Sequence, residues 1–200
     1  MTRAMNLLAV PIGWLQLWIF TALGILFFAA LIRALSRRKS ESVDRTAGKS
    51  RLGIALQSIA FFLTGFGRTQ PTLPSWSPAS IAGAVAVLLL MGGTLYLFVA
   101  SSNALGKNWS FQARMRTDHQ LIRNGPYAHV RHPIYLGMLL FLLGLAVALG
   151  HYLQLIVSLP LFLIGTRIRT KSEDELLEAQ FGTAFTDYAR STPAVIPRLG

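Results

Sequence analysis

The sequence predicts an all-α, polytopic membrane protein with about five transmembrane helices and a C-terminal helix on the cytoplasmic side. Hydrophobic residues make up 52% of the 200 residues and charged residues only 14%, which is about half the charged fraction of a soluble domain. Several apolar runs approach about 20 residues, the length that spans a bilayer. The basic residues lie mainly in the polar segments between these runs, a pattern typical of topology signals and lipid headgroup contacts.

The composition also excludes several kinds of partner. The net charge of +11 does not indicate nucleic acid binding, because the basic residues are spread over loops and no basic groove motif with interleaved aromatic residues occurs. The chain has no cysteine, so it forms neither disulfides nor thiolate metal sites. His119, His129 and His132 have no carboxylate at ligand spacing, so we expect no metal. Membrane lipids are the expected surroundings.

Residues 1–101 are predicted to form three transmembrane helices that serve as a membrane scaffold. The apolar run 7–32 is too long for the core of a secretory signal peptide and leads directly into a basic loop, so we interpret it as an uncleaved span. The second helix is predicted over 52–67 and the third over 80–101. Prolines in the segment between the second and third helices block helix formation there.

Residues 102–200 are predicted to form a second unit, the core that carries the site. It begins with a polar segment that is too polar to cross a bilayer. Helix four is expected over 133–149, and after a tight turn at Gly150-His151 helix five is expected to return as far as about Thr166. The two helices would form an antiparallel hairpin. Pro160 predicts a kink in helix five, which neighbouring helices tolerate in a membrane.

The distribution of charge predicts the topology. With five spans, the segments 33–51 and 102–132 and the tail from Arg167 onward lie on one side of the membrane. These three segments hold 17 of the 19 Lys and Arg residues and all eight acidic residues. The bias predicts a cytoplasmic C-terminus and an outside N-terminus, as in a bacterial inner membrane protein. Arg167 and Arg169 are either stop-transfer charges or groups that neutralise a ligand carboxylate.

One stretch, residues 125–137, concentrates turn-forming and polar residues at the start of an apolar helix. Pro126 forces a turn, and Pro133 suits the first turn of a helix, where its missing N–H costs nothing. Arg131 and His132 thus lie at the mouth of helix four. They are interpreted either as a basic pair that contacts lipid headgroups or as a site for an anion or a cofactor.

A second polar cluster lies near the start of the tail, where helical periodicity extends over 173–189. Glu173 and Asp174 are acids near a helix N-terminus, a position that the helix dipole favours. Ser172 and Glu175 have the spacing of a capping box. The alternative is that these carboxylates bind ribose hydroxyls or an ammonium group.

Five groups of residues follow one another in a fixed order between positions 103 and 198. They are Leu105-Gly-x-x-Trp-Ser, His119-x-Leu-Ile-x-x-Gly-Pro-Tyr, Arg131-His-Pro-Ile-Tyr-Leu-Gly, Arg167-x-Arg-Thr with Glu173-Asp-x-x-Leu-x-x-x-Phe-Gly, and Tyr188 with Ile196-Pro197. In order and spacing they resemble the isoprenylcysteine carboxyl methyltransferase and phospholipid methyltransferase family of membrane enzymes. Residues before 103 resemble this family only as spanning helices.

The resemblance implies an enzyme that uses S-adenosylmethionine, held between the last two spans, the loop before them and the C-terminal segment. The cofactor-binding residues would be His119, Leu121, Gly125, Tyr127, Arg131, His132, Pro133, Tyr135, Gly137, Glu173 and Asp174. The catalytic residues would be Arg131, Arg167 and Arg169. The substrate would be lipophilic, either an isoprenylcysteine-like carboxylate or a phospholipid amine, and it would react at the cytoplasmic face.

Two other functions compete with methyl transfer. Membrane sterol reductases, which use NADPH, resemble the same C-terminal region, although they are usually larger. A non-enzymatic membrane protein whose basic loops hold anionic lipid would have the same charge pattern. Only the last of these predicts that no cofactor binds.

Overall fold

The computed structural model describes residues 9–37, 43–46, 50–106, 114–116 and 120–197. The helices are α2 (Trp14–Ser36), α3 (Ser50–Gly65), α4 (Pro78–Leu105), the 3₁₀ turn η2 (Gly125–Ala128), α5 (Pro133–Leu149), α6 (Leu155–Phe181) and α7 (Thr183–Ser191). Two short strands, β1 (Val43–Thr46) and β2 (Arg114–Arg116), pair in antiparallel orientation.

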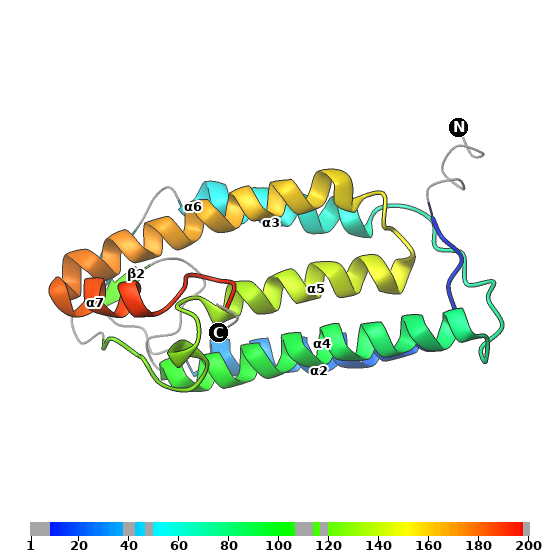
Figure 1. Ribbon diagram of the computed structural model, residues 1–200, viewed down its shortest axis with the longest axis horizontal. Coiled ribbons are helices and arrows are strands. Elements are labelled where there is room, and N and C mark those ends of the chain that lie inside the picture. Colours follow the sequence, from blue (N-terminus) through cyan, green and yellow to red (C-terminus); the bar gives the residue numbers. More distant parts are fainter. Residues whose placement is uncertain (1–8, 38–42, 47–49, 107–113, 117–119, 198–200) are drawn as a thin grey trace.

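The five long helices form a bundle with α5 in its middle. Figure 1 shows α2 beside α4 on one side of α5 and α3 beside α6 on the other. Aromatic contacts connect the layers through Phe141 of α5, whose ring centroid lies 5.8 Å from that of Phe20 and 5.5 Å from that of Phe61. Phe61 in turn meets Phe162 of α6 at 5.8 Å. Phenylalanine rings from α2, α3, α5 and α6 thus form one apolar layer through the bundle.

Large apolar side chains also cover the outside of the bundle. On α2 and α4, for example, Trp18, Ile25 and Leu89 are each about two thirds exposed. By length and composition, α2 and α4 are the two described helices long and apolar enough to cross a membrane, and α5 is a shorter apolar helix of 17 residues. Such an outer surface suits lipid, in which helices satisfy all of their own backbone hydrogen bonds. The count of five spans remains a prediction.

The polar segments gather at one end of the bundle. The last residues of α2, α4 and α6 and the first residues of α3 and α5 lie at this end, together with α7 and β2 (Figure 1). The opposite end holds the connections from α3 to α4 and from α5 to α6. At that end His151 is fully buried, and its Nδ1 lies 2.9 Å from the carbonyl oxygen of Thr64, so this histidine fastens the α5–α6 turn to α3.

Two expectations about the second half of the chain are wrong. Helix five does not stop at Thr166, because α6 continues to Phe181. Ser172 therefore caps no helix: it lies inside α6, where its hydroxyl donates to the carbonyl oxygen of Ile168 at 2.9 Å. The apolar run ends near Thr166, but the following residues are mostly good helix formers with no Gly or Pro before Gly182, so the helix outlasts the apolar run.

The two-stranded sheet was also not predicted. β1 has four residues and β2 has three, and each lies in a segment that the sequence analysis treated only as a polar connection. The two strands are short and show little alternation of apolar and polar residues, so their sequences alone do not predict a sheet. They pair because the helices place them side by side at the polar end of the bundle. Apart from this small sheet, the described elements are helical, as expected.

Candidate functional site

The residues from Gly125 to Pro133 form a folded path from the polar segment into α5. Gly125 has a φ of +59°, a conformation that suits glycine, and it opens the η2 turn. Pro133 occupies the first turn of α5 and is fully buried. The C-terminal segment runs beside this path, because the amides of Arg131 and His132 donate to the carbonyls of Pro193 and Ala194 at 2.9 and 2.8 Å. Backbone pairing with the tail thus fixes the start of α5.

Two acidic side chains of α6 face this start of α5. The ring of His132 lies between them, with Nε2 at 2.9 Å from Asp174 Oδ1 and Nδ1 at 3.4 Å from Glu173 Oε2. Arg131 Nη2 approaches the second oxygen of Asp174 at 2.9 Å. The hydroxyl of Tyr135 donates to Oε1 of Glu173 in a short hydrogen bond. We call these five residues the ion cluster.

The two carboxylates set the charge of the histidine. Burial alone would lower the pKa of His132, but hydrogen bonds to Asp174 and Glu173 outweigh burial and raise its pKa to about 9. Burial would raise the pKa of Asp174, but His132 and Arg131 outweigh it and hold that pKa below its usual value. At neutral pH the imidazole is therefore a cation that donates from both nitrogens, and it is not available as a base.

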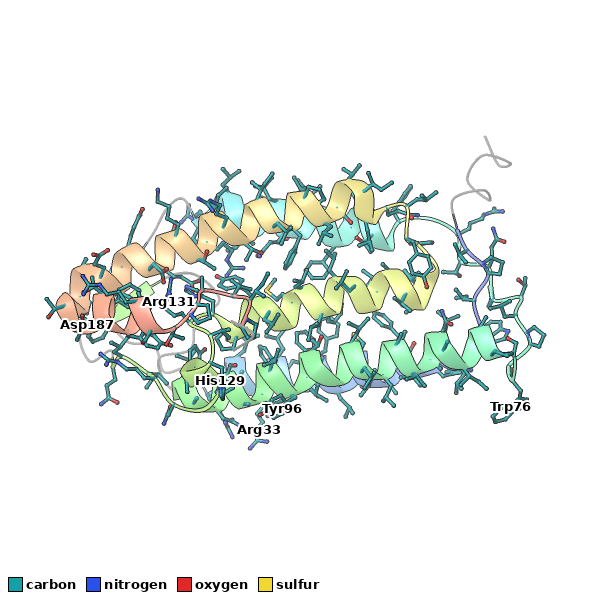
Figure 2. The ribbon with its side chains drawn as sticks, viewed as in Figure 1. Arg33, Trp76, Tyr96, His129, Arg131 and Asp187 are labelled. Carbon is teal, nitrogen blue, oxygen red and sulfur yellow. The ribbon has the colours of Figure 1, made fainter. Side chains whose placement is uncertain are left out.

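Arg131 ties the cluster to the C-terminal helix. Besides Asp174, its guanidinium donates to the carbonyl oxygens of Ala189 and Thr192, so it lies among α6, α7 and the start of α5 (Figure 2). The hydroxyl of Tyr188 in α7 donates to the carbonyl oxygen of Tyr127 in η2. Because α7 is bonded to Arg131 through Ala189 and to η2 through Tyr188, it covers one side of the ion cluster.

A buried guanidinium extends the site toward the bundle interior. Arg169 of α6 is only 6% exposed, and its Cζ lies 4.8 Å from the centre of the Tyr135 ring, the geometry of a cation–π contact. Its Nη1 donates to Oε1 of Gln57 in α3 at 2.8 Å. The amide of Gln57 donates in turn to the hydroxyl of Thr166 at 2.8 Å. A chain of polar contacts therefore leads from α3 through Arg169 and Tyr135 to Glu173.

Gly53 leaves room for this arginine at a point where α3 and α6 approach each other closely. A Cβ atom at Gly53 would lie 2.4 Å from Cγ of Arg169 and 2.7 Å from the carbonyl oxygen of Gly165. Only a residue without a side chain fits between the two helices at this point. Gln57 and Gly53 were not predicted as site residues, because α3 was expected to be scaffold. The signal in the sequence was a glutamine four residues after a glycine in a mainly apolar helix.

The remaining predicted site residues differ in how close they lie to the ion cluster. Arg167 is exposed on α6 and takes no part in the ion cluster, whereas Arg169, two residues on, is buried beside it. Leu121 is half-buried in the segment before η2. Gly137 faces α4, where an added Cβ would touch Leu97 at 3.4 Å, so helix packing is sufficient to explain this glycine. His119 lies outside the described residues.

Comparison with known proteins shows the family to which this sequence is similar. The sequence model described as the isoprenylcysteine carboxyl methyltransferase (ICMT) family matches residues 84–179. The cobalt-zinc-cadmium resistance protein CzcN of Cupriavidus metallidurans is 30% identical over 164 residues, which are 80% of this chain and 69% of that protein. The nickel-cobalt-cadmium resistance protein NccN of Alcaligenes xylosoxydans xylosoxydans is 32% identical over 161 residues, 78% of this chain and 69% of that protein. The chain belongs to the isoprenylcysteine carboxyl methyltransferase family.

A protein-S-isoprenylcysteine O-methyltransferase of Schizosaccharomyces pombe is 34% identical over 88 residues, which are 44% of this chain and only 37% of that protein. The structure of a eukaryotic intramembrane Ras methyltransferase ICMT aligns with 74% of this chain and 52% of that chain, at 22% identity and a TM-score of 0.48. The matched family region contains α5 and all the residues of the ion cluster. The family match and the relatives of 30% identity or more confirm the resemblance, and the chain is an integral membrane protein of this family.

Proposed function

We propose that this family member transfers a methyl group from S-adenosylmethionine to a lipophilic substrate, at the cytoplasmic face of a bacterial inner membrane. The observation that carries the proposal is the ion cluster, in which α6 acids meet the start of α5 at the end of an apolar bundle. The proposal includes five spans, with the N-terminus outside and the C-terminus inside, as the charge distribution predicts. It also divides the chain at about residue 101 into a scaffold and a cofactor-binding core.

The residues of the cluster fit such a cofactor. Each carboxylate oxygen of Glu173 and Asp174 has one protein partner within hydrogen-bonding or ion-pairing distance, and a carboxylate oxygen can accept a second hydrogen bond. The two acidic side chains are about one quarter exposed. The cluster therefore still offers partly exposed acceptors for hydroxyl and ammonium groups.

The residues of the ion cluster would hold and orient the cofactor, and they would not transfer protons. When bound, the cofactor supplies an electrophilic methyl group. His132 is a buried cation and both acids are ion-paired, so the cluster is a rigid frame in which His132, Tyr135 and Arg131 fix the two carboxylates. Methyl transfer depends mainly on aligned approach of the two partners, and such a frame provides alignment.

Arg169 favours a substrate that carries a negative charge. Its guanidinium is buried between α3 and α6, on the interior side of Tyr135, where an apolar environment strengthens attraction to an anion. A carboxylate would be drawn to this position and an ammonium group would be repelled. Of the two substrate classes that the sequence analysis left open, the position of Arg169 supports an isoprenylcysteine-like carboxylate over a phospholipid amine.

The direct test uses the purified full chain with S-adenosylmethionine labelled in its methyl group and a bacterial membrane extract. We expect the label to enter a lipid fraction as a base-labile ester, which a carboxylate acceptor forms and an amine acceptor does not. Replacing Glu173 with Gln should abolish labelling, while replacing the exposed Arg51 with Ala should leave it unchanged. Label in a base-stable product would reject the carboxylate substrate, and binding of NADPH without any labelling would point to a reductase.

A further inference from the structure

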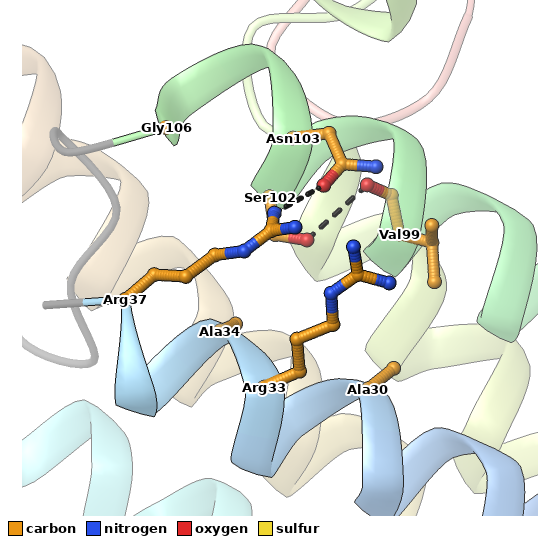
Figure 3. Close-up of a pocket in the computed structure, with 8 residues that line it drawn as sticks. All are labelled: Ala30, Arg33, Ala34, Arg37, Val99, Ser102, Asn103 and Gly106. Carbon is orange, nitrogen blue, oxygen red and sulfur yellow. Dashed lines mark hydrogen bonds between the residues drawn. The ribbon is translucent and has the colours of Figure 1, made fainter.

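A second polar site lies away from the ion cluster, in a pocket between α2 and α4. Its volume is about 80 Å³, more than a single water molecule requires. Figure 3 shows the guanidinium groups of Arg33 and Arg37 reaching from α2 toward the end of α4. The full lining consists of Ala30, Arg33, Ala34, Arg37, Val99, Ser102, Asn103 and Gly106.

The two arginines are held in place and lack a negative partner among the described residues. Arg37 Nη1 donates to the side-chain oxygen of Asn103 at 2.9 Å, which anchors it to α4. None of the ion pairs between described residues includes Arg33 or Arg37. Two like charges four residues apart on a helix repel each other. An anion between them would remove this repulsion, and the planar guanidinium fork suits phosphate oxygens.

The surroundings of the pocket are those of a membrane–water boundary. The pocket lies at the polar end of the bundle, and Figure 2 shows Arg33 and Tyr96 on the outer side of the α2–α4 layer. Tyr96 is 68% exposed, and tyrosine is enriched at the headgroup level of bilayers. Toward the middle of the two helices the pocket-facing surfaces are apolar: Leu26, one turn before Ala30 on α2, is 53% exposed, and Leu88, three turns before Val99 on α4, is 50% exposed. A phosphate in the pocket could therefore have acyl chains running along α2 and α4.

We propose that this pocket binds the phosphate of an anionic phospholipid, with Arg33 and Arg37 as the charged contacts and Asn103 and Ser102 as polar ones. The proposal rests on the membrane placement of α2 and α4 but not on methyl transfer, so each can fail without the other. It also assigns a ligand-binding role to the first half of the chain, which was expected to be scaffold.

A simpler explanation must be separated from lipid binding. Both α2 and α4 end near the pocket, and basic residues at helix C-termini stabilise the helix dipole without any ligand. That role depends only on the charges. Lipid binding also depends on the space between the helices, so a variant that fills the pocket while keeping both arginines distinguishes the two.

The test titrates phosphatidylglycerol, and separately phosphatidylcholine with the same acyl chains, into the full chain in detergent micelles. We expect tighter binding of phosphatidylglycerol by the unaltered chain. A charge-assisted hydrogen bond between a guanidinium and a phosphate oxygen contributes about tenfold in affinity, so Arg33→Ala/Arg37→Ala should weaken phosphatidylglycerol binding about 100-fold. Val99→Trp, which keeps both charges and fills the pocket, should also weaken it and thereby covers the case in which the double variant does not fold.

The matched control is Arg51→Ala/Lys171→Ala, which removes the same charge from exposed positions at the same end of the bundle. We expect this control to bind phosphatidylglycerol as the unaltered chain does. The proposal is overturned if the control loses as much affinity as the arginine variant, because the effect would then be one of net charge. It is also overturned if Val99→Trp binds normally, or if inorganic phosphate binds as tightly as the lipid.

Discussion

Raising the pH from 6.5 to 9.5 should destabilise the protein through His132. A histidine whose pKa is raised by folding stabilises the folded state fully below its unfolded pKa, and this contribution is lost as the pH rises through the folded pKa. For His132 these values are 6.5 and about 9. The difference corresponds to about 3 kcal/mol as an upper value, which for a chain of this size is about 6–12 °C in Tm.

Thermal unfolding in one detergent at several pH values between 6.5 and 9.5 measures this effect. The unaltered chain should lose Tm steadily across the range. The variant His132→Gln has no group that titrates at this position, so its Tm should be lower at pH 6.5 and much less dependent on pH. If His132→Gln shows the same decline as the unaltered chain, other groups cause the pH dependence and the charged state assigned to His132 is wrong.

Three further predictions concern the arginine that extends the site. Gly53→Ala should reduce methyl transfer strongly, because the new Cβ would lie 2.4 Å from Cγ of Arg169; a normal rate would show that Arg169 moves freely. Gln57→Leu should lower stability by about 1–3 kcal/mol, the usual cost of removing one partner of a buried polar pair, and should raise the KM for a carboxylate substrate, whereas Gln57→Glu should retain part of the function; unfolding midpoints and initial rates measure both. Arg169→Ala should abolish transfer, while Arg167→Ala should leave the rate within about twofold, since only Arg169 is buried beside the cluster; equal losses in the two variants would contradict the assignment.

Much of the helical framework could be predicted because an apolar run of membrane-spanning length has few alternative structures. The start of α5 at Pro133 was predicted correctly, since proline fixes the first turn of a helix. The end of α6 was not, because the end of an apolar run was taken as the end of a helix. Glu173 and Asp174 therefore lie well inside α6, where they project toward α5 from a rigid element.

The candidate site was predicted only where its residues belong to a recognisable order. The pair Arg131 and His132 lies about forty residues before the two acids in the sequence. The resemblance to the family predicted that all four residues belong to one site. Gln57 belongs to none of the ordered groups, and a glutamine near a glycine in α3 does not show which helix lies opposite. Its role follows from tertiary contact, in which Gly53 allows the two helices to approach.

The central claim, that the ion cluster holds S-adenosylmethionine, is tested most directly by calorimetric titration of this cofactor into the purified chain in detergent. We predict saturable binding that weakens at least tenfold in His132→Gln and in Glu173→Gln, in line with the loss of a hydrogen bond to a charged group. Binding should be unchanged in Arg51→Ala, and NADPH should not compete. Equal affinity in the unaltered chain and in both cluster variants, or no binding to the folded protein at all, would contradict the claim.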